Sequence, residues 1–363
     1  VDSYLDMLAE AYPDTVTLVN AGKSFEGRDI NYKVYNVKLS NATQQDDLFK
    51  LKSDIVDFWR KPCVKYNVVG KAMVPPSHSD WFEERLAEIG VAKDVYIEDI
   101  LDHLYALQEV YANSTTTVEL VVYSQTDENR PLVYLKLTNG DATGKPVALL
   151  EAAINPRDWV TVPSALNVVN RLLEDDNRMF LDVADWIIVP VVNPDGYEYT
   201  HTNVNRNFDV DWLVSDSSSS PCSHLYAGTD PGSEIETQMI KHLIEEYSPR
   251  LYISLQNSGK FVTYPWRFEK AASGLFRRHY LKGLEVINAL EGYTLDSGAI
   301  AIGDRESGTS VDFARHSRVF YTFNIGVGGE DDDGVIVPED DIFRIAEDIW
   351  RAVAAAARGL ELN

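Results

Sequence analysis

The sequence predicts an α/β protein that combines a large doubly wound sheet, mixed and mainly parallel, with a small ferredoxin-like α+β unit. Continuous apolar runs at 147–154 and 186–192 are typical of strands buried on both faces of a mainly parallel sheet. Helical patterns fall between such runs, and this alternation favours the doubly wound class. At 363 residues the chain is also too long for one small core, so we expect a large and a small domain.

The small unit is expected at residues 33–100, where the period of the apolar residues changes several times. The pattern predicts a strand, a helix, a strand, a helix closed by Gly90 and a last strand, at 33–38, 44–59, 64–74, 79–90 and 94–100. This order is typical of a two-layer ferredoxin-like unit.

The large domain is expected at residues 101–363. Further apolar runs at 251–255 and 320–325 predict two more buried strands. Helices are predicted at 161–173, 233–247 and 270–290, and a final one from 339, opened by Pro338 and closed by Arg358 and Gly359.

An internal repeat relates residues 4–30 to residues 103–132. Both segments read as a helix, a strand and a polar turn in the same order, which is typical of duplication. Residues 1–32 are therefore interpreted as a partial repeat of the start of the large domain. The sequence leaves open which copy joins the main sheet.

Composition excludes some classes of partner and location. The net charge of −24 disfavours nucleic acid and anionic membranes as partners. No run approaches the ~18 apolar residues of a membrane span. Cys63 and Cys222 imply no disulfide framework, and whether they pair stays open. Asn41 and Asn113 fit the glycosylation pattern and favour an extracellular location.

A series of motifs in fixed order is the most specific signal. They are AINPRDW, VPVVNPDGYEYTH, NRNFD, PCSHLYAG, SEIET, YISLQNSGKFVTYPW, ESGTSVDFA and FYTFNIGVGGEDDDGVIVP. Together they resemble the secreted zinc carboxypeptidases of the A/B type over residues 101–363. Residues 33–100, with DFWRKP, MVPP and VYIEDI, look like the pro-domain of those enzymes.

The resemblance implies a degenerate metal site. Where the family carries His, Arg and Glu in its first metal-binding turn, this chain has Asn155, Arg157 and Asp158, and the family's third ligand, a His, corresponds to Gln256. Carboxamides are neutral, weak ligands, and an Asp carboxylate is held about 1.5 Å further back than that of a Glu. We therefore expect no zinc and no other cofactor.

The resemblance also implies a loss of catalytic groups. An ungapped match places Gly326 where the general base Glu stands, and Asp304 where a tyrosine closes over the substrate. The stretch between His201 and Asn205 is shorter than in the family and lacks an Arg that steadies the oxyanion. No catalytic residue is therefore predicted.

Part of a peptide pocket is expected to remain. Asn205 and Arg206 match the family's pair that grips the substrate's terminal carboxylate, and Arg157 persists beside them. Val311 falls where the family selects its side chain, so an apolar preference is expected. The alternative is that Arg206 simply pairs with one of the many local acids.

The resulting hypothesis is a non-catalytic carboxypeptidase homologue, an extracellular binding, storage or structural protein whose partners are peptide C-termini or another small carboxylate. A divergent enzyme that holds Ca²⁺ or Mg²⁺ through oxygen ligands is the alternative. A regulator that binds peptide C-termini through Arg206 without cutting them is a third reading.

Because no Lys or Arg lies between Asp94 and Asn129, we expect the small unit to stay attached. Oligomeric state is left open.

Overall fold

The computed structural model describes residues 33–360 except 52–55, 61, 66–69, 75, 98–99, 113, 141–143, 157, 200–203, 221–222, 224, 258 and 328–338. The chain divides into two compact units between Ile100 and Leu101. No described helix is both long and apolar enough to cross a membrane. The predicted partial repeat at 1–32, Asn113, Arg157 and Cys222 lie outside the described residues.

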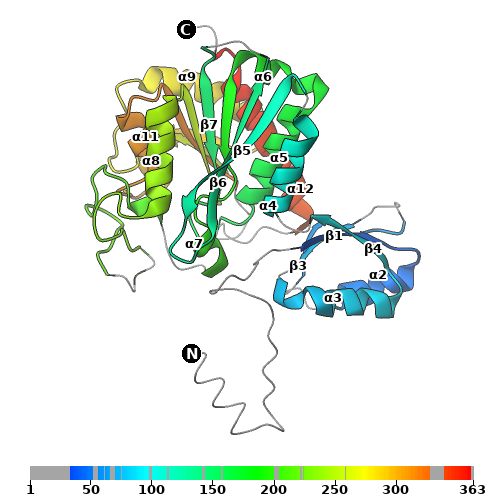
Figure 1. Cartoon of the computed structure of the whole chain (residues 1–363). Helices are drawn as coiled ribbons and strands as arrows, with labels where there is room; N and C mark the ends of the chain where they lie inside the picture. The colour runs from blue at the N-terminus through cyan, green and yellow to red at the C-terminus, as the bar shows by residue number, and fades with distance from the viewer. Residues whose placement is uncertain are drawn as a thin grey trace. The chain divides into compact units, whose positions relative to one another are not determined.

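The small unit has the βαββαβ order of a ferredoxin-like fold. Its elements are β1 (Lys33–Lys38), α2 (Ala42–Phe49), β2 (Asp57–Arg60), β3 (Gly70–Val74), α3 (Pro76–Ile89) and β4 (Ala92–Ile97). The antiparallel sheet has the order β2-β3-β1-β4. Figure 1 shows α2 and α3 along one face of this sheet. The core includes Tyr35 and Phe82, whose ring centroids are 5.4 Å apart.

One helix of the small unit was predicted too long. The structure ends α2 at Phe49 and forms β2 from Asp57, within the predicted helix 44–59. The apolar spacing continues past Phe49, but Phe58 pairs with Ala72 of β3, so sheet pairing overrides the local helical pattern. Asn41 is exposed and caps the N-terminus of α2, because its side-chain oxygen accepts a hydrogen bond from the Gln44 amide at 2.9 Å.

The large unit is built on an eight-stranded mixed sheet. Its strands are β5 (Thr116–Gln125), β6 (Pro131–Asn139), β7 (Val147–Glu151), β8 (Asp185–Val189), β9 (Leu251–Gln256), β10 (Phe261–Tyr264), β11 (Thr294–Ser297) and β12 (Tyr321–Gly326). Their order is β11-β10-β12-β9-β7-β8-β6-β5. The four central strands are parallel, and antiparallel pairs flank them on both sides. The predicted α/β class is confirmed.

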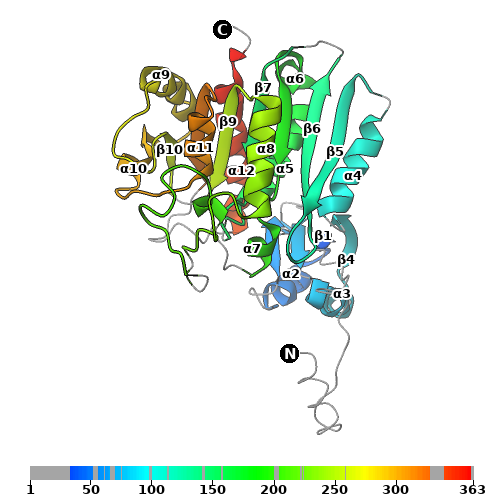
Figure 2. The ribbon, with the colours of Figure 1, turned by 60° about the vertical axis from the view of Figure 1, so that its left-hand side comes forward.

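Helices cover both faces of this sheet. They are α4 (Ile100–Tyr111), α5 (Thr161–Leu173), α6 (Met179–Val183), α7 (Pro194–Tyr199), α8 (Ile235–Tyr247), α9 (Phe276–Ile287), α10 (Gly298–Ala301), α11 (Ser310–His316) and α12 (Glu339–Ala357), with 3₁₀ turns η1 (Asp175–Asn177) and η2 (Val204–Arg206). Figure 1 shows α8 and α11 on one side of the sheet and α5 and α12 on the other. Figure 2 shows α8 in front of β7 and β9, with α12 behind the sheet.

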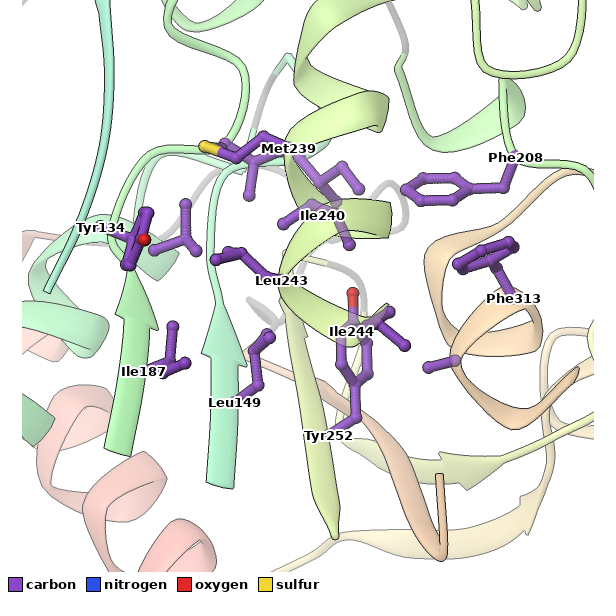
Figure 3. Close-up of a cluster of buried hydrophobic side chains, with 14 of the residues drawn as sticks. Tyr134, Leu149, Ile187, Phe208, Met239, Ile240, Leu243, Ile244, Tyr252 and Phe313 are labelled. Atoms are coloured by element: carbon purple, nitrogen blue, oxygen red, sulfur yellow. The ribbon is translucent and has the colours of Figure 1, made fainter. Parts of the chain in front are cut away.

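A hydrophobic core packs α8 onto one face of the sheet. Figure 3 shows Met239, Ile240, Leu243 and Ile244 of α8 directed toward the sheet, which presents Leu149, Ile187 and Tyr252. Phe208 and Phe313 close this cluster, with ring centroids 5.6 Å apart. Packing through this cluster therefore holds α8 and α11 against the sheet.

The second copy of the repeat belongs to the main sheet. Residues 103–132 form most of α4, then β5 and the first residues of β6, and β5 pairs with β6 along its length. The sequence left open which copy of the repeat joins the main sheet, and the structure shows that residues 103–132 do.

Candidate functional site

The candidate site lies where β7, β9 and β12 end, as expected for an α/β sheet. Glu151, Gln256 and Gly326 are the last residues of these strands, and Gly326 stands opposite Gln256 in the register. After β7 the chain continues through buried Ala152–Ile154 into the turn that precedes α5.

The structure brings the three predicted metal positions together. Asn155 Nδ2 donates to Asp158 Oδ2 at 2.7 Å. The backbone amide of Asn257, next to Gln256, donates to Asp158 Oδ1 at 3.0 Å. Both oxygens of Asp158 thus accept hydrogen bonds, Oδ2 from within its own turn and Oδ1 from the residue that follows β9. Burial raises the pKa of Asp158 to about 7, although these hydrogen bonds and the positive charge of Arg267 act against the rise.

Arg267 supplies the cation of this site. It follows β10 by three residues, and its side chain is only 4 % exposed. Its Nη1 donates to Gln256 Oε1 at 2.9 Å, and its Nη2 pairs with Glu306 Oε2. Its backbone amide donates to both carboxylate oxygens of Asp312, at 3.1 and 2.9 Å. A guanidinium therefore binds the oxygen that a metal at the third position would need.

These residues do not fit zinc. Asn155 directs its amide nitrogen, a donor, at Asp158, and Gln256 directs its oxygen at a positive charge. Zinc sites in proteins use imidazole, thiolate and carboxylate groups that are free to coordinate. Across the part of the chain that the structure describes, no three His, Cys, Asp or Glu residues are grouped so as to hold a metal ion.

The predicted carboxylate receptor is occupied by the chain's own acids. Arg206 is buried in η2, and its Nη2 lies 2.7 Å from Asp216 Oδ2 and 3.3 Å from Glu306 Oε1. Its Nε donates to the Asp216 carbonyl at 2.8 Å and its Nη1 to the Asn205 carbonyl at 2.9 Å. Asn205 Oδ1 accepts the Ser310 amide at 2.9 Å. This is the arrangement of the alternative interpretation, in which Arg206 pairs with local acids.

Glu306 bridges the two guanidinium groups. Burial alone would raise its pKa, but the charges of Arg267 and Arg206 outweigh burial and hold the pKa of Glu306 below its ordinary value. A continuous line of contacts thus runs from Gln256 through Arg267, Glu306 and Arg206 to Asp216.

The remaining predicted positions lie around this line of contacts. Val311 is buried at the start of α11, beside Asp312, whose backbone amide donates to Thr309 Oγ1. Asp304 is exposed in the loop between α10 and α11, and its carboxylate accepts the amide of Arg305. Gly326 is buried and offers no side chain.

Sequence reasoning missed four polar residues of this region, of which three are buried and Glu306 is largely buried. They are Arg267, Glu306, Glu151 and Asn324. Ser310 Oγ donates to Glu151 Oε1 at 2.6 Å, and burial raises the pKa of Glu151 to about 7. Asn324 pairs with Ser254 in the sheet, and neither its Oδ1 nor its Nδ2 has a hydrogen-bond partner among the described residues. An amide side chain within a mostly apolar run, as in TFNI, was the signal available for Asn324.

Comparison with known proteins agrees with this architecture. The profile of the family described as zinc carboxypeptidase matches residues 1–50 and 102–352, and that of the carboxypeptidase activation peptide matches residues 35–104. Carboxypeptidase B of Helicoverpa zea is 30 % identical over 300 residues, which are 72 % of this chain and 69 % of that protein. Carboxypeptidase A2 of Rattus norvegicus is 25 % identical over 356 residues, 81 % of this chain and 85 % of that protein.

Solved structures share the fold. Thrombin activatable fibrinolysis inhibitor superposes with a TM-score of 0.65 at 21 % identity, over 92 % of this chain and 100 % of that one. Carboxypeptidase A from Helicoverpa armigera gives a TM-score of 0.61 at 22 % identity, over 92 % and 98 %. The chain therefore belongs to the zinc carboxypeptidase family and carries the family's activation-peptide domain.

Proposed function

We propose that this chain is a non-catalytic member of the zinc carboxypeptidase family, an extracellular binding, storage or structural protein. The observation that carries the proposal is the hydrogen bond from Arg267 Nη1 to Gln256 Oε1 at 2.9 Å. A divalent cation at the same oxygen would lie beside a fixed positive charge, and that repulsion is strong where water is excluded. The extracellular location is supported by the activation-peptide domain and by the exposed Asn41 acceptor.

The alternative of an oxygen-ligated Ca²⁺ or Mg²⁺ has less support. Those ions need six or more oxygen ligands, including carboxylates free to face the ion. Here both oxygens of Asp158 accept hydrogen bonds, and the Gln256 oxygen faces Arg267. Moving a cation into this site would break all three contacts.

Two measurements test the proposal directly. The protein is dialysed against micromolar zinc, its metal content is measured by mass spectrometry, and it is then incubated with peptides that end in apolar residues. We expect substoichiometric zinc and intact peptides, with an active zinc carboxypeptidase assayed in parallel. Stoichiometric zinc together with release of C-terminal residues would overturn the proposal.

A restoration series isolates the contribution of Arg267. One variant carries Asn155→His, Asp158→Glu and Gln256→His, the residues found in the family, and a second adds Arg267→Ser. The second variant is expected to bind zinc at least about tenfold more tightly, because the competing cation has been removed. Equal zinc affinity in the two variants would show that Arg267 is not the obstacle.

A further inference from the structure

The guanidinium of Arg206 has the donors of a carboxylate receptor, but they are already used. One edge, Nε and Nη2, contacts the carbonyl and the carboxylate of Asp216. Nη2 also faces Glu306 Oε1 at 3.3 Å, and Nη1 donates to a backbone carbonyl. An incoming carboxylate would therefore have to displace one of the two acids.

Glu306 is held in place through the backbone of its own segment. The backbone of residues 306–308 is hydrogen-bonded to three other segments, through Glu306 N to Arg267 O (2.9 Å), Ser307 N to Ser215 O (3.1 Å), Gly308 N to Val210 O (2.9 Å) and Phe208 N to Gly308 O (3.0 Å). Gly308 has a φ of +67°, and a Cβ placed there would lie 2.2 Å from the Arg206 carbonyl oxygen. The glycine therefore lets this segment pack directly against the residue that Glu306 neutralises.

Charge balance explains why Glu306 stays bound. Arg206 and Arg267, with side chains 6 % and 4 % exposed, face the carboxylates of Asp216 and Glu306. Two positive and two negative charges cancel in this buried group. Without Glu306, the two guanidinium groups would lose the carboxylate that they share, and a negative charge would be missing beside two buried positive charges, which is costly away from water.

We propose that the Glu306 carboxylate is a built-in ligand of Arg206, and that its removal uncovers a binding site for an external carboxylate such as the C-terminus of a peptide. The inference deepens the proposed function, because a chain that turns over no substrate can keep its carboxylate receptor filled by its own side chain. The Glu306 side chain is 15 % exposed, so its place is reached from solvent once it is shortened.

The test combines chemical rescue with direct binding. Glu306→Ala and the isosteric Glu306→Gln are compared with the wild type and with Glu269→Ala, which removes one charge from an exposed position nearby. Acetate is expected to raise the melting temperature of Glu306→Ala more than chloride at equal ionic strength, and to leave the wild type and Glu269→Ala unchanged. A ligand that binds only the folded state stabilises it by mass action.

Calorimetry then uses a peptide that ends in leucine, with a free or an amidated C-terminus. Glu306→Ala is expected to bind the free peptide at least about tenfold more tightly than the amide, and the wild type to bind neither. Wild-type binding as tight as that of the variant, or a folded, shortened variant that neither acetate nor the peptide affects, overturns the inference. Should Glu306→Ala not fold, Glu306→Ser, which is shortened in a similar way, decides by the same two readouts. Glu306→Gln keeps the volume of the side chain and is expected to bind neither acetate nor the peptide. Cleavage of the peptide by the wild type would contradict the proposed lack of turnover. The difference in affinity between the free and the amidated peptide in Glu306→Ala tests the inference separately.

Discussion

Replacing Arg267 with methionine is expected to destabilise the large unit by about 3 to 5 kcal/mol, the cost of removing one partner from a buried ion pair. The variant leaves Glu306 with Arg206 alone and Gln256 Oε1 without its donor. Because Glu306 keeps one of its two guanidinium partners, the lower end of that range, about 3 kcal/mol, is expected. The backbone amide of residue 267 still donates to Asp312, so the loss comes from the side chain.

The stability lost in Arg267→Met should depend on pH, because the ion pair requires an ionised Glu306. Glu306 has a lowered pKa in the folded state, so its contribution to stability is present above its unfolded pKa and is lost as pH falls through the folded value. Removing Arg267 reduces that contribution, so the stabilities of the variant and the wild type should converge in acid. Urea unfolding at pH 7 and pH 3, followed by near-ultraviolet circular dichroism, measures both quantities.

A matched control separates the ion pair from a general loss of positive charge. Arg277 is exposed on α9, and Arg277→Met is expected to change stability by less than about 0.5 kcal/mol. A deficit for Arg267→Met below about 1 kcal/mol at pH 7, or one of the same size at pH 3, would refute the reasoning.

Three further predictions address backbone, buried acid and surface. Gly308→Ala should cost about 1 to 3 kcal/mol more than Gly140→Ala by urea unfolding, because both glycines have φ +67° but only a Cβ at Gly308 meets backbone; equal losses would contradict this. Glu151 keeps its proton in the folded state up to about pH 7 instead of 4.5, so wild-type stability falls as pH rises through this window. Glu151→Gln should remove up to about 3 kcal/mol of this decrease in the free energy of unfolding. A variant with the same pH profile as the wild type would contradict the role given to Glu151. In a glycosylating host Thr43→Ala should lower the intact mass by one glycan while Asn41 still caps its helix, whereas an unchanged mass would show that Asn41 carries none.

The sequence predicted the central part of the fold well because its signals there are long. The apolar runs of β7, β8, β9 and β12 and the periodic pattern of α5 extend over enough residues to identify element type. Strands β10 and β11 have only four residues each, and β11 reads TLDS, so pairing with neighbours rather than local pattern defines them.

The candidate site was predictable in its positions and not in its contacts. The order of motifs located Asn155, Asp158 and Gln256, which the structure brings together. The partner of Gln256 is Arg267, eleven residues away on another segment, and the partners of Arg206 are Asp216 and Glu306. Neither pairing has a fixed local spacing, so no motif could reveal them. Roles that the family resemblance assigns to Gly326 and Asp304 stay predictions.

The alternating line of acids and guanidinium groups has a consequence for the history of this chain. Each charge in the line is neutralised by its neighbour. Changing any one of them alone therefore leaves a buried group without its counter-charge. Two members of a pair must therefore change together, because each single substitution lowers stability before a second one can restore the balance of charge.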